Sequence, residues 1–533
     1  MTTETSIYEF AKRSAEQFAA KTALWFYGKG ISYQKLFEKI DRVADNLHCL
    51  GVCRGTVVTI HLPNCPQAVM AIYAVAKLGG ICNMVHPQVP WNGLKSNMEF
   101  CESKILITGG HFSQADQVAS DITSIYVSIS DYMGEIYRFG YKIKNRNQKP
   151  QHAVGFSDLE KVSAGHAPVI QQESLSECCV AYLNSSGTTG TPKTVMHCHR
   201  AFNNWVHNAQ AFFRHKGLAD EVVLTALPFF HGSGLVMNLH QVLCGGGEQI
   251  LFAKWDAKLA AKLVKKKKIT IITGVPFLYQ SLIEQKGFRA KDVGHITQCF
   301  VSGDHVPLEL KEKFDAVVGH RALFEGYGMT ETVTACFSTS RYDDCPEASG
   351  YPLINAHAAV LAEDDKLHQT GCGEFFLSTN TMMMGYLKDP KATGAVVVER
   401  DGKTWFRTGD YGEIDENGYL FFYERMKNII IRNGYNIYPY EIEALIQRLD
   451  YVAETAVIGC RAETSKGEDI VAFVAIGPSA DQEEIRKEIL KISAENLPKY
   501  SIPNEIVFVE KLPRNRMNKI DVKALKEIYE GSC

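Results

Sequence analysis

The 533-residue sequence lacks several features that would assign it to a specialised class of protein. It has no CxxC pair, and its 15 cysteines follow no repeated short spacing, which argues against a disulfide scaffold or a zinc cluster. Lysine and arginine together number 57, against 60 aspartates and glutamates. A dedicated nucleic-acid-binding protein usually carries a basic excess, so nucleic acid is not an expected partner.

We expect neither a targeting segment nor a membrane-spanning segment in this sequence. The opening MTTETSIYEFAKR has an acidic residue early and lacks the basic-then-apolar order of a secretory signal. The best candidate for a membrane helix, 68–76, stops at Lys77, whereas a spanning helix needs about 20 residues. We therefore expect a soluble cytoplasmic protein with reduced thiols and no stable membrane insertion.

What the first 350 residues do contain is an alternation of helices and short apolar strands. Apolar residues at three- and four-residue spacing predict helices over 5–20 and 32–50. Strands are expected over 57–62, 105–108, 223–227, 269–273 and 298–301. This alternation predicts an α/β fold with a parallel sheet covered on both faces, whose ligand sites lie beyond the carboxyl ends of the strands.

The remainder of the chain has a different texture. From about 350 to 425, strand-like segments alternate with Gly and Asp turns, which predicts a β-rich subdomain of a large N-terminal domain, 1–425. The polar link Glu424-Arg425-Met426-Lys427 then leads to a small α+β domain, 426–533. Its expected elements are helices over 439–449, 481–495 and 521–529 and strands over 455–459 and 470–476.

One basic and aromatic segment, YRFGYKIKNRNQK at 137–149, is set apart from this pattern. Because the whole chain has no basic excess, we expect a surface loop rather than a nucleic-acid patch. Weak contact with a membrane or a partner is the second interpretation.

The segment YLNSSGTTGTPKT at 182–194 carries the strongest chemical signal. Glycines let a backbone approach phosphates closely, hydroxyl and N–H groups donate to phosphate oxygens, and Lys193 adds a positive charge. A P-loop, GxxxxGK[ST], would need a second glycine where this chain has Pro192, which has no N–H to offer. We therefore expect a phosphate-binding loop of another kind.

This loop resembles the phosphate loop of the adenylate-forming superfamily, which includes acyl-CoA synthetases, aryl-CoA ligases, luciferases and the adenylation domains of peptide synthetases. Further segments match that family in order and spacing across nearly the whole chain. They are SGD at 302–304, EGYGMTET at 325–332, FRTGD at 406–410, NGYNIYPYEIE at 433–443 and LPRNRMNKID at 512–521. The chain departs from the family pattern at Thr194, Glu424 and Asn518, where glycine is usual.

The resemblance implies a nucleotide site. Tyr327 would stack on adenine, Thr330 would donate to the α-phosphate, and Glu331 would bind Mg²⁺, for which a carboxylate oxygen is a suitable ligand. Asp410 would hold the ribose hydroxyls, and Arg425 would also contact the nucleotide. The other implied ATP- or AMP-binding residues are Ser185, Ser186, Gly187, Thr188, Thr189, Gly190, Thr191, Lys193, Ser302, Gly303, Asp304, Gly326, Gly328 and Met329.

The resemblance also implies residues for the two chemical steps. Lys519 matches the catalytic lysine, the Asn433-Gly434 turn matches the loop along the CoA pantetheine tunnel, and Lys427 matches the hinge residue of a mobile C-terminal domain. His231, in LPFFHGSGL at 227–235, would be a catalytic residue that gates the junction of the acyl and CoA sites.

The expected activity is that of an AMP-forming acyl-CoA synthetase. A carboxylic acid would react with ATP and Mg²⁺ to give acyl-AMP and pyrophosphate, and the thiol of CoA would then displace AMP. Because Phe229-Phe230-His231 contains no aspartate to pair with an ammonium group, a free α-amino acid is not the expected acid.

Three other interpretations stay open. The adenylate could be loaded onto the phosphopantetheine of a carrier protein, the reaction could stop at the adenylate, or the protein could bind nucleotide without catalysis. Chain length of the acid is not readable from the sequence. A homodimer is an expectation from the resemblance alone.

Overall fold

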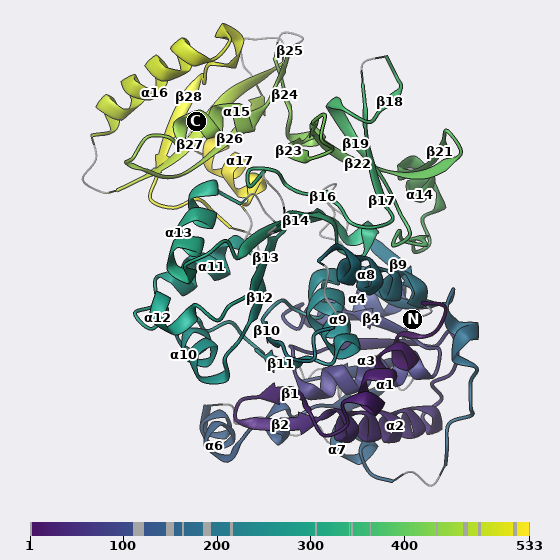
Figure 1. Cartoon of the computed structure of the whole chain (residues 1–533). Coiled ribbons are helices and arrows are strands. Elements are labelled where there is room, and N and C mark those ends of the chain that lie inside the picture. Colours follow the sequence, from purple (N-terminus) through teal and green to yellow (C-terminus); the bar gives the residue numbers. More distant parts are fainter. Residues whose placement is uncertain are drawn as a thin grey trace. The chain divides into compact units, whose positions relative to one another are not determined.

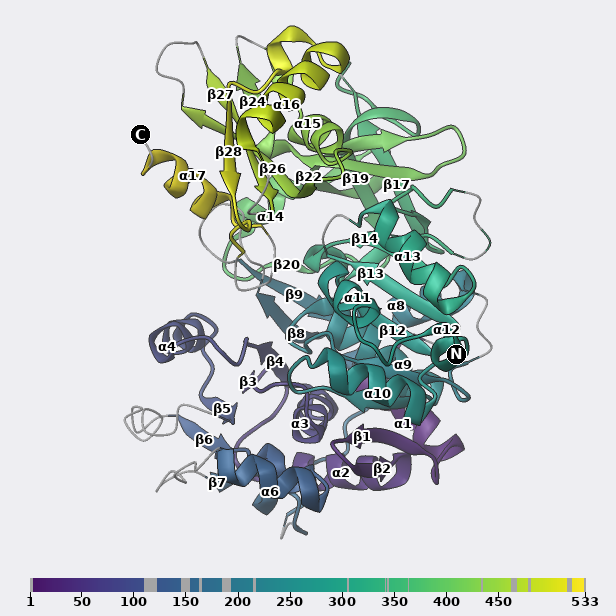
Figure 2. The ribbon, with the colours of Figure 1, turned by 90° about the vertical axis from the view of Figure 1, so that its left-hand side faces the viewer.

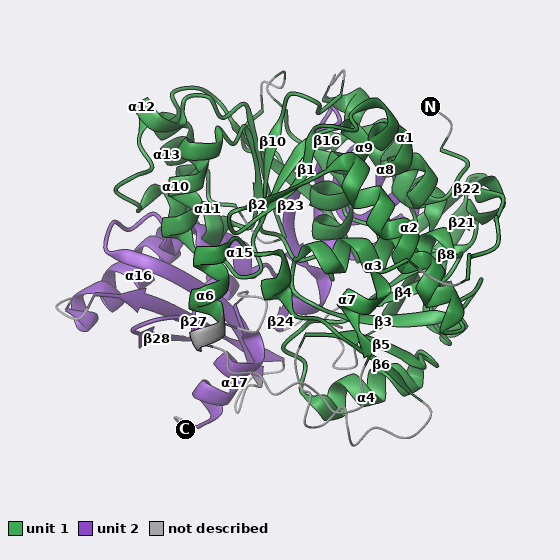
Figure 3. Ribbon diagram, turned by 90° about the horizontal axis from the view of Figure 1, so that it is seen from below, with its two compact units in different colours: residues 1–357, 378–406 green, residues 358–377, 407–533 purple. Residues whose placement is uncertain are grey.

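The chain divides into two units, which are described separately. Unit 1 comprises residues 1–357 and 378–406, and unit 2 comprises residues 358–377 and 407–533 (Figures 1 and 3). The computed structural model describes residues 3–109, 122–144, 154–162, 165–184, 193–213, 217–303, 306–340, 342, 345–362, 364–432, 435–461, 467–477, 481–514 and 520–531. Functional domain boundaries at 425 and 426 stay a prediction.

The first sheet of unit 1 is nine-stranded. Its strand order is β16 (Tyr351–Pro352), β15 (Ala335–Ser338), β14 (Leu323–Gly328), β13 (Gln298–Ser302), β12 (Ile271–Gly274), β10 (Val222–Thr225), β11 (Glu248–Leu251), β1 (Thr22–Phe26) and β2 (Lys29–Ser32). The strands from β14 to β1 are parallel, and β2, β15 and β16 pair antiparallel at the edges. Helices α10 (Ala257–Lys267), α11 (Pro276–Ile283) and α13 (Leu308–Val318) connect the parallel strands (Figure 1).

The second sheet of unit 1 is eight-stranded. Its order is β20 (Gly385–Tyr386), β9 (Thr194–Cys198), β8 (Cys179–Asn184), β4 (Ile81–Met84), β3 (Val57–His61), β5 (Ile105–Thr108), β6 (Thr123–Tyr126) and β7 (Val154–Gly155). The strands from β8 to β7 are parallel, while β9 pairs antiparallel with both β8 and β20. Because β20 comes from far along the chain, this edge brings Tyr386 beside the residues that follow the phosphate loop.

Both sheets share one hydrophobic core with the helices α1 (Ile7–Gln17), α2 (Tyr33–Cys49), α3 (Pro66–Lys77) and α8 (His199–Phe212). Leu24 of β1 and Val58 of β3 belong to the same buried cluster as residues of these helices. Figure 2 shows α3 next to β3, and α2 next to β1 and β2. Every residue of α3 from Pro66 to Ala76 is buried, which explains why this helix is apolar all round.

Unit 2 begins as a β-rich segment and ends as an α+β tail. The first part contains most of β17 (Ala356–Leu361) and β19 (Gly371–Thr379), β18 (Leu367–His368), the second part of β22 (Lys403–Ile414) and β23 (Leu420–Arg425). The tail contains β24 (Ile430–Arg432), β25 (Tyr435–Ile437), α15 (Pro439–Ile446), β26 (Val452–Arg461), β27 (Glu468–Ile476), α16 (Gln482–Asn496), β28 (Glu505–Val509) and α17 (Val522–Glu530). Strands β26, β27 and β28 form one sheet, and α15 and α16 pack over its apolar residues.

The predicted fold class, a large α/β part followed by a small α+β part, is confirmed. The surface loop expected over 137–149 is wrong in its described portion, because 135–144 form the helix α6 (Glu135–Lys144). Across the described ranges, no helix is both long and apolar enough to span a bilayer. No cysteine in those ranges takes part in a disulfide.

Candidate active site

A short turn after β14 holds the predicted phosphate and magnesium residues. Residues Thr330–Thr332 form one 3₁₀ turn, and each of its three backbone carbonyls accepts a hydrogen bond from a distant segment. The ring Nε2 of His197 lies 2.7 Å from the carbonyl of Thr330, and the backbone N–H of Met383 donates to that of Glu331 at 2.8 Å. The hydroxyl of Thr381 donates to the carbonyl of Thr332 at 3.1 Å. The backbone of the turn is therefore fixed from outside at every residue.

The next residue, Val333, has φ 69° and ψ −54°, a γ-turn conformation that is rare and strained for a β-branched side chain. Gly232 makes room for it, since a Cβ on Gly232 would lie 1.7 Å from the carbonyl oxygen of Val333. The hydroxyls of Ser233 and Thr334 lie 2.7 Å apart beside this contact. Strain of this kind persists only where surrounding contacts over-determine the backbone, and it clusters at functional sites.

Tyr386 connects the carboxylate of the turn to the lysine of the phosphate loop. Its hydroxyl donates to Oε1 of Glu331 at 2.8 Å, and the Nζ atom of Lys193 lies 4.5 Å from the centroid of its ring. Burial, followed by the negative charge of Glu331, raises the pKa of Tyr386 far above its usual range. The phenol therefore keeps its proton and acts as a donor.

His197, on β9, is fully buried, and this burial lowers its pKa to about 4. The ring is therefore neutral at ordinary pH. Because a carbonyl oxygen can only accept, the proton of the ring sits on Nε2 and is donated to Thr330.

The two segments expected around adenine are neighbours in the nine-stranded sheet. Ser302 at the end of β13 pairs in parallel register with Gly326 of β14, and Gly303 follows in the left-handed conformation at φ 90°. Gly328 lets β14 approach β15, because a Cβ there would lie 2.3 Å from the carbonyl oxygen of Thr334. The carboxyl ends of β13 and β14 thus lie side by side, where such folds place a ligand.

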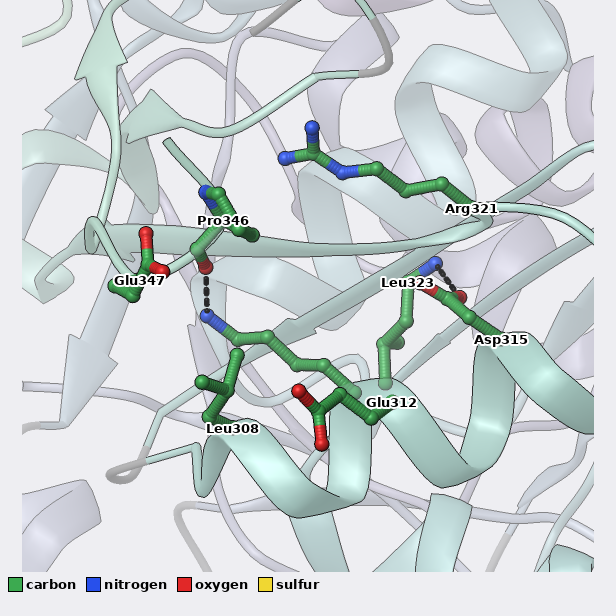
Figure 4. Close-up of a pocket in the computed structure, with 8 residues that line it drawn as sticks. Leu308, Glu312, Asp315, Arg321, Leu323, Pro346 and Glu347 are labelled. Carbon is green, nitrogen blue, oxygen red and sulfur yellow. Dashed lines mark hydrogen bonds between the residues drawn. The ribbon is translucent and has the colours of Figure 1, made fainter. Parts of the chain in front are cut away.

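An ion pair links β14 to helix α13. Nζ of Lys311, on α13, lies 2.6 Å from Oε2 of Glu325 and 2.9 Å from the carbonyl oxygen of Pro346. Burial raises the pKa of Glu325, and the charge of Lys311 opposes that shift. An open cavity of about 350 Å³ is lined by Lys311 together with residues that include Pro346 and Glu347 (Figure 4). Its lining contains none of the residues predicted to bind nucleotide.

His231 lies in the turn before the π-helix Ser233–His240. Its backbone N–H donates to the carbonyl of Pro228 at 3.0 Å, and its ring centroid is 4.7 Å from that of Phe230. Phe230 in turn lies 4.4 Å from the ring of His86. Since Gly232 contacts Val333, the turn that carries His231 adjoins the turn that carries Thr330 and Glu331.

Unit 2 contains Asp410, which is predicted to hold the ribose, and Arg425, which is predicted to contact the nucleotide. Asp410 and Arg425 are paired residues of β22 and β23, and Nε of Arg425 lies 2.9 Å from Oδ1 of Asp410. The carboxylate of Asp410 is fully buried, whereas the side chain of Arg425 is 38% exposed. Glu424 accepts hydrogen bonds from the N–H of Arg425 at 2.7 Å and from Nδ2 of Asn428 at 3.0 Å. Burial raises the pKa of Glu424.

Two tyrosine pairs each join a residue before the predicted hinge to a residue after it. Lys427 is in the 3₁₀ turn Met426–Asn428, directly after β23. Tyr411 stacks on Tyr438 and Tyr423 stacks on Tyr440, each pair with ring centroids 4.7 Å apart. The β-rich segment and the start of α15 are thus in contact through rings.

Other predicted site residues lie outside the described residues. These are Ser185, Ser186, Gly187, Thr188, Thr189, Gly190, Thr191, Asp304, Asn433, Gly434 and Lys519. Their roles stay predictions. Conversely, His197, Tyr386 and Lys311 were not predicted from the sequence, because each acts on a residue of another segment and no local spacing marks it.

Comparison with known proteins agrees with the motifs. Residues 11–387 match the family model of the AMP-binding enzymes, and residues 441–519 match that of the AMP-binding enzyme C-terminal domain. The chain is 30% identical to a long-chain-fatty-acid–CoA ligase of Bacillus subtilis, with 96% of this chain and 93% of the relative aligned. It is 27% identical to 4-coumarate–CoA ligase 1 of Arabidopsis thaliana, with 98% and 92% aligned.

A solved structure gives the same result. The crystal structure of ATP-bound MatB from Rhodopseudomonas palustris superposes with a TM-score of 0.84, at 25% identity over 98% of this chain and 99% of that one. The family model alone covers well over half of the sequence. The chain therefore belongs to the AMP-binding enzyme family, the adenylate-forming superfamily that its motifs predict.

Proposed function

We propose that this protein is an AMP-forming acid–thiol ligase. It converts a carboxylic acid and ATP to acyl-AMP and pyrophosphate, and then transfers the acyl group to the thiol of CoA with release of AMP. The observation that carries this proposal is the geometry of the turn 330–332. Each of its three carbonyls accepts a hydrogen bond from another segment, and Tyr386 contacts both the carboxylate of Glu331 and the ammonium group of Lys193.

In the first step, an oxygen of the substrate carboxylate attacks the α-phosphorus of ATP and pyrophosphate leaves. This step needs positioning and charge stabilisation rather than a covalent enzyme intermediate. Thr330 donates to the α-phosphate, and the ammonium groups of Lys193 and Lys519 stabilise the negative charge that develops. In the second step the sulfur of CoA attacks the acyl carbon and AMP leaves, with His231 at the junction of the two sites.

The donor set suits Mg²⁺ that arrives with ATP. Mg²⁺ is usually held by one or two carboxylates, with water and substrate phosphates completing its shell. Within the described residues, no three His, Cys, Asp or Glu side chains gather as a metal site, whereas Glu331 offers one oriented carboxylate. When bound, the metal ion supplies charge neutralisation of the phosphates.

An acid with an uncharged tail is the proposed substrate class. Phe230, His231 and His86 form a chain of ring contacts, and Phe229 is buried, so the segment provides no carboxylate for an α-ammonium group. The matched relatives from Bacillus subtilis and Arabidopsis thaliana are named as ligases of a long-chain fatty acid and of 4-coumarate. Fatty and aryl acids are both in the proposed class.

The test is an acid panel incubated with MgATP, with and without CoA, and read by mass spectrometry. Fatty, aryl and α-amino acids are compared at equal concentration, and pyrophosphate exchange reports adenylation. Acyl-CoA from a fatty or aryl acid is the expected product. Adenylate formation without acyl-CoA would instead favour a carrier protein as acceptor, and saturating activity with an amino acid would overturn the substrate class. If no acid exchanges pyrophosphate, the protein is a nucleotide-binding protein without ligase activity.

Lys519→Ala separates the two steps. Removing one preorganised charge donor should lower pyrophosphate formation by about 10²–10⁴ while supplied acyl-AMP and CoA still react. Equal losses in both half-reactions would show that Lys519 is not specific to adenylation.

A further inference from the structure

Tyr386 contacts two oppositely charged groups with two different parts of its side chain. Its hydroxyl is 2.8 Å from Oε1 of Glu331, and its ring centroid is 4.5 Å from Nζ of Lys193. Lys193 and Glu331 are far apart in sequence and belong to two different segments that are predicted to contact the phosphates. One side chain therefore fixes the relative position of both.

The backbone of Tyr386 is itself held rigidly. It pairs with Val195 in the edge pairing of β20 with β9, and its N–H donates to Oγ1 of Thr393 at 2.9 Å. Thr393 belongs to α14 (Pro390–Val396), a helix whose N-cap Asp389 accepts from the N–H of Ala392. Because β9 begins directly after Lys193, Tyr386 and Lys193 are anchored to the same strand.

The hydroxyl leaves Glu331 partly available. A carboxylate has two oxygens, and the hydrogen bond to Oε1 restricts rotation of the side chain without consuming Oε2 as an acceptor. Groups that hydrogen-bond to a metal-binding carboxylate orient it, and their removal typically costs 10- to 100-fold in metal affinity or activity.

The ring acts on Lys193 by a different interaction. A cation over the face of an aromatic ring is attracted by the ring quadrupole, and the attraction increases where water is excluded. Tyr386 is 6% exposed, so its ring is largely shielded. A phenylalanine would keep this contact and lose the hydroxyl.

We propose that Tyr386 is a positioning residue of the adenylation step, whose hydroxyl orients Glu331 toward the magnesium of MgATP and whose ring holds the ammonium of Lys193 beside it. This inference rests on the roles of Glu331 and Lys193 in the proposed function. It assigns separate effects to the two halves of one side chain, and these can be separated by substitution.

The experiment compares Tyr386→Phe and Tyr386→Leu in the full-length protein. Binding of Mn²⁺ in the presence of a non-hydrolysable ATP analogue is measured by electron paramagnetic resonance, and binding of the analogue without metal is measured by calorimetry. Tyr386→Phe should weaken Mn²⁺ binding about tenfold and leave metal-free binding of the analogue unchanged. Tyr386→Leu should weaken both.

Tyr132→Phe is the matched control. The hydroxyl of Tyr132 also donates to a carboxylate, Oε2 of Glu160 at 2.6 Å, and Nζ of Lys39 lies 5.5 Å from its ring centroid. This trio contains none of the residues assigned to the site, so the variant should bind Mn²⁺ and the analogue as the wild type does. A general effect of losing a buried Tyr–Glu pair would appear in the control as well.

Glu331→Gln distinguishes failure of this inference from failure of the proposed function. If Glu331→Gln weakens Mn²⁺ binding but Tyr386→Phe binds as the wild type does, the role of Tyr386 is wrong and that of Glu331 stands. If Glu331→Gln also has no effect, the proposed metal role of Glu331 is wrong, and the Tyr386 role falls with it. Thermal unfolding of each variant is measured first. If Tyr386→Leu does not fold, Tyr386→Phe alone tests the role of the hydroxyl. The role of the ring contact is then tested with Lys193→Met, by measuring binding of the analogue without metal. Unchanged binding by Lys193→Met would overturn the role of the ring contact.

Discussion

The imidazole of His197 donates a hydrogen bond from Nε2 to the backbone carbonyl of Thr330 at 2.7 Å. The bond joins β9, which follows the phosphate loop, to the turn that presents Thr330 and Glu331. Since the His197 ring is buried and neutral, this contact is a positional one and adds no charge to the site.

Replacing His197 by leucine should therefore impair adenylation. The carbonyl of Thr330 would lose its external donor, at a cost of about 1–3 kcal/mol, and the turn would be less well fixed. We expect kcat/KM for ATP in pyrophosphate exchange to fall roughly tenfold, a change of about 1.4 kcal/mol in the barrier. His207→Leu is the control. His207 is exposed on helix α8, which directly follows β9, so this variant should behave as the wild type. An unchanged KM and kcat in the His197 variant would mean that the hydrogen bonds to the carbonyls of Glu331 and Thr332 are enough to fix the turn.

Gly232→Ala tests the strained residue after the turn. The new Cβ would lie 1.7 Å from the carbonyl oxygen of Val333, so the backbone of one of the two segments has to move. We expect a loss of about 1–3 kcal/mol in unfolding free energy, as in other overpacked sites, together with a raised KM for ATP. Gly287→Ala is the control, because a Cβ at Gly287 meets nothing within 4 Å. Full stability and activity of Gly232→Ala would contradict the close contact.

Lys427→Pro tests the predicted hinge. Lys519 and the pair Asn433-Gly434 are predicted to belong to the same small domain but are assigned to different half-reactions, so we expect the tail to rotate between them. Proline fixes φ in the 3₁₀ turn 426–428 and should trap one arrangement, lowering thioester formation much more than adenylation. The two half-reactions are assayed separately on protein shown to be folded, with Lys427→Ala as the control for loss of the charge. Two unimpaired steps would place the pivot elsewhere, and equal modest losses would indicate a destabilised linker.

Glu443 makes the stability of the tail dependent on pH. Its carboxyl on α15 accepts the N–H of Val457 at 2.7 Å, and burial, reinforced by the negative charge of Glu424, raises its pKa to about 8. Because the pKa of Glu443 is higher in the folded than in the unfolded protein, its protonated carboxyl stabilises the fold fully below about pH 4.5. This contribution to the free energy of unfolding is lost as the pH rises through 8. Glu443→Gln should make unfolding free energy fall less steeply with rising pH, and the variant should unfold at higher urea than the wild type at pH 9.

Urea unfolding of both proteins is measured from pH 5 to pH 9. Glu505→Gln, at an exposed position of β28, should retain the slope of the wild type. A parallel slope in Glu443→Gln would show that another group is responsible for it.

Helices and strands with a local periodicity were predicted well from the sequence, whereas contacts between distant segments were predicted poorly. The helices expected over 5–20 and 32–50 are α1 and α2, and the helix and strand expected over 481–495 and 470–476 are α16 and β27. The described part of the segment 137–149, residues 137–144, was predicted wrongly because its basic and aromatic residues hid the helical spacing of α6.

The same distinction applies to the candidate site. Lys193, Tyr327, Glu331 and Asp410 were predicted because each stands in a contiguous motif with a recognisable spacing. Tyr386 was missed because its partner Glu331 is 55 positions away in the sequence, and no local motif indicates that the two residues meet.

The two tyrosine stacks beside the hinge affect how often the tail occupies the stacked arrangement and how often it is rotated away from it. Turning the tail about 426–428 would separate Tyr411 from Tyr438 and Tyr423 from Tyr440. An aromatic pair contributes about 0.5–1.5 kcal/mol beyond its buried area, so two pairs favour the stacked arrangement by roughly 5- to 150-fold. Ligands can shift that equilibrium only through their differential affinity for the two arrangements. Each catalytic cycle would then begin and end at the same resting conformer, and the rotated one would exist chiefly while acyl-adenylate or CoA occupies the site.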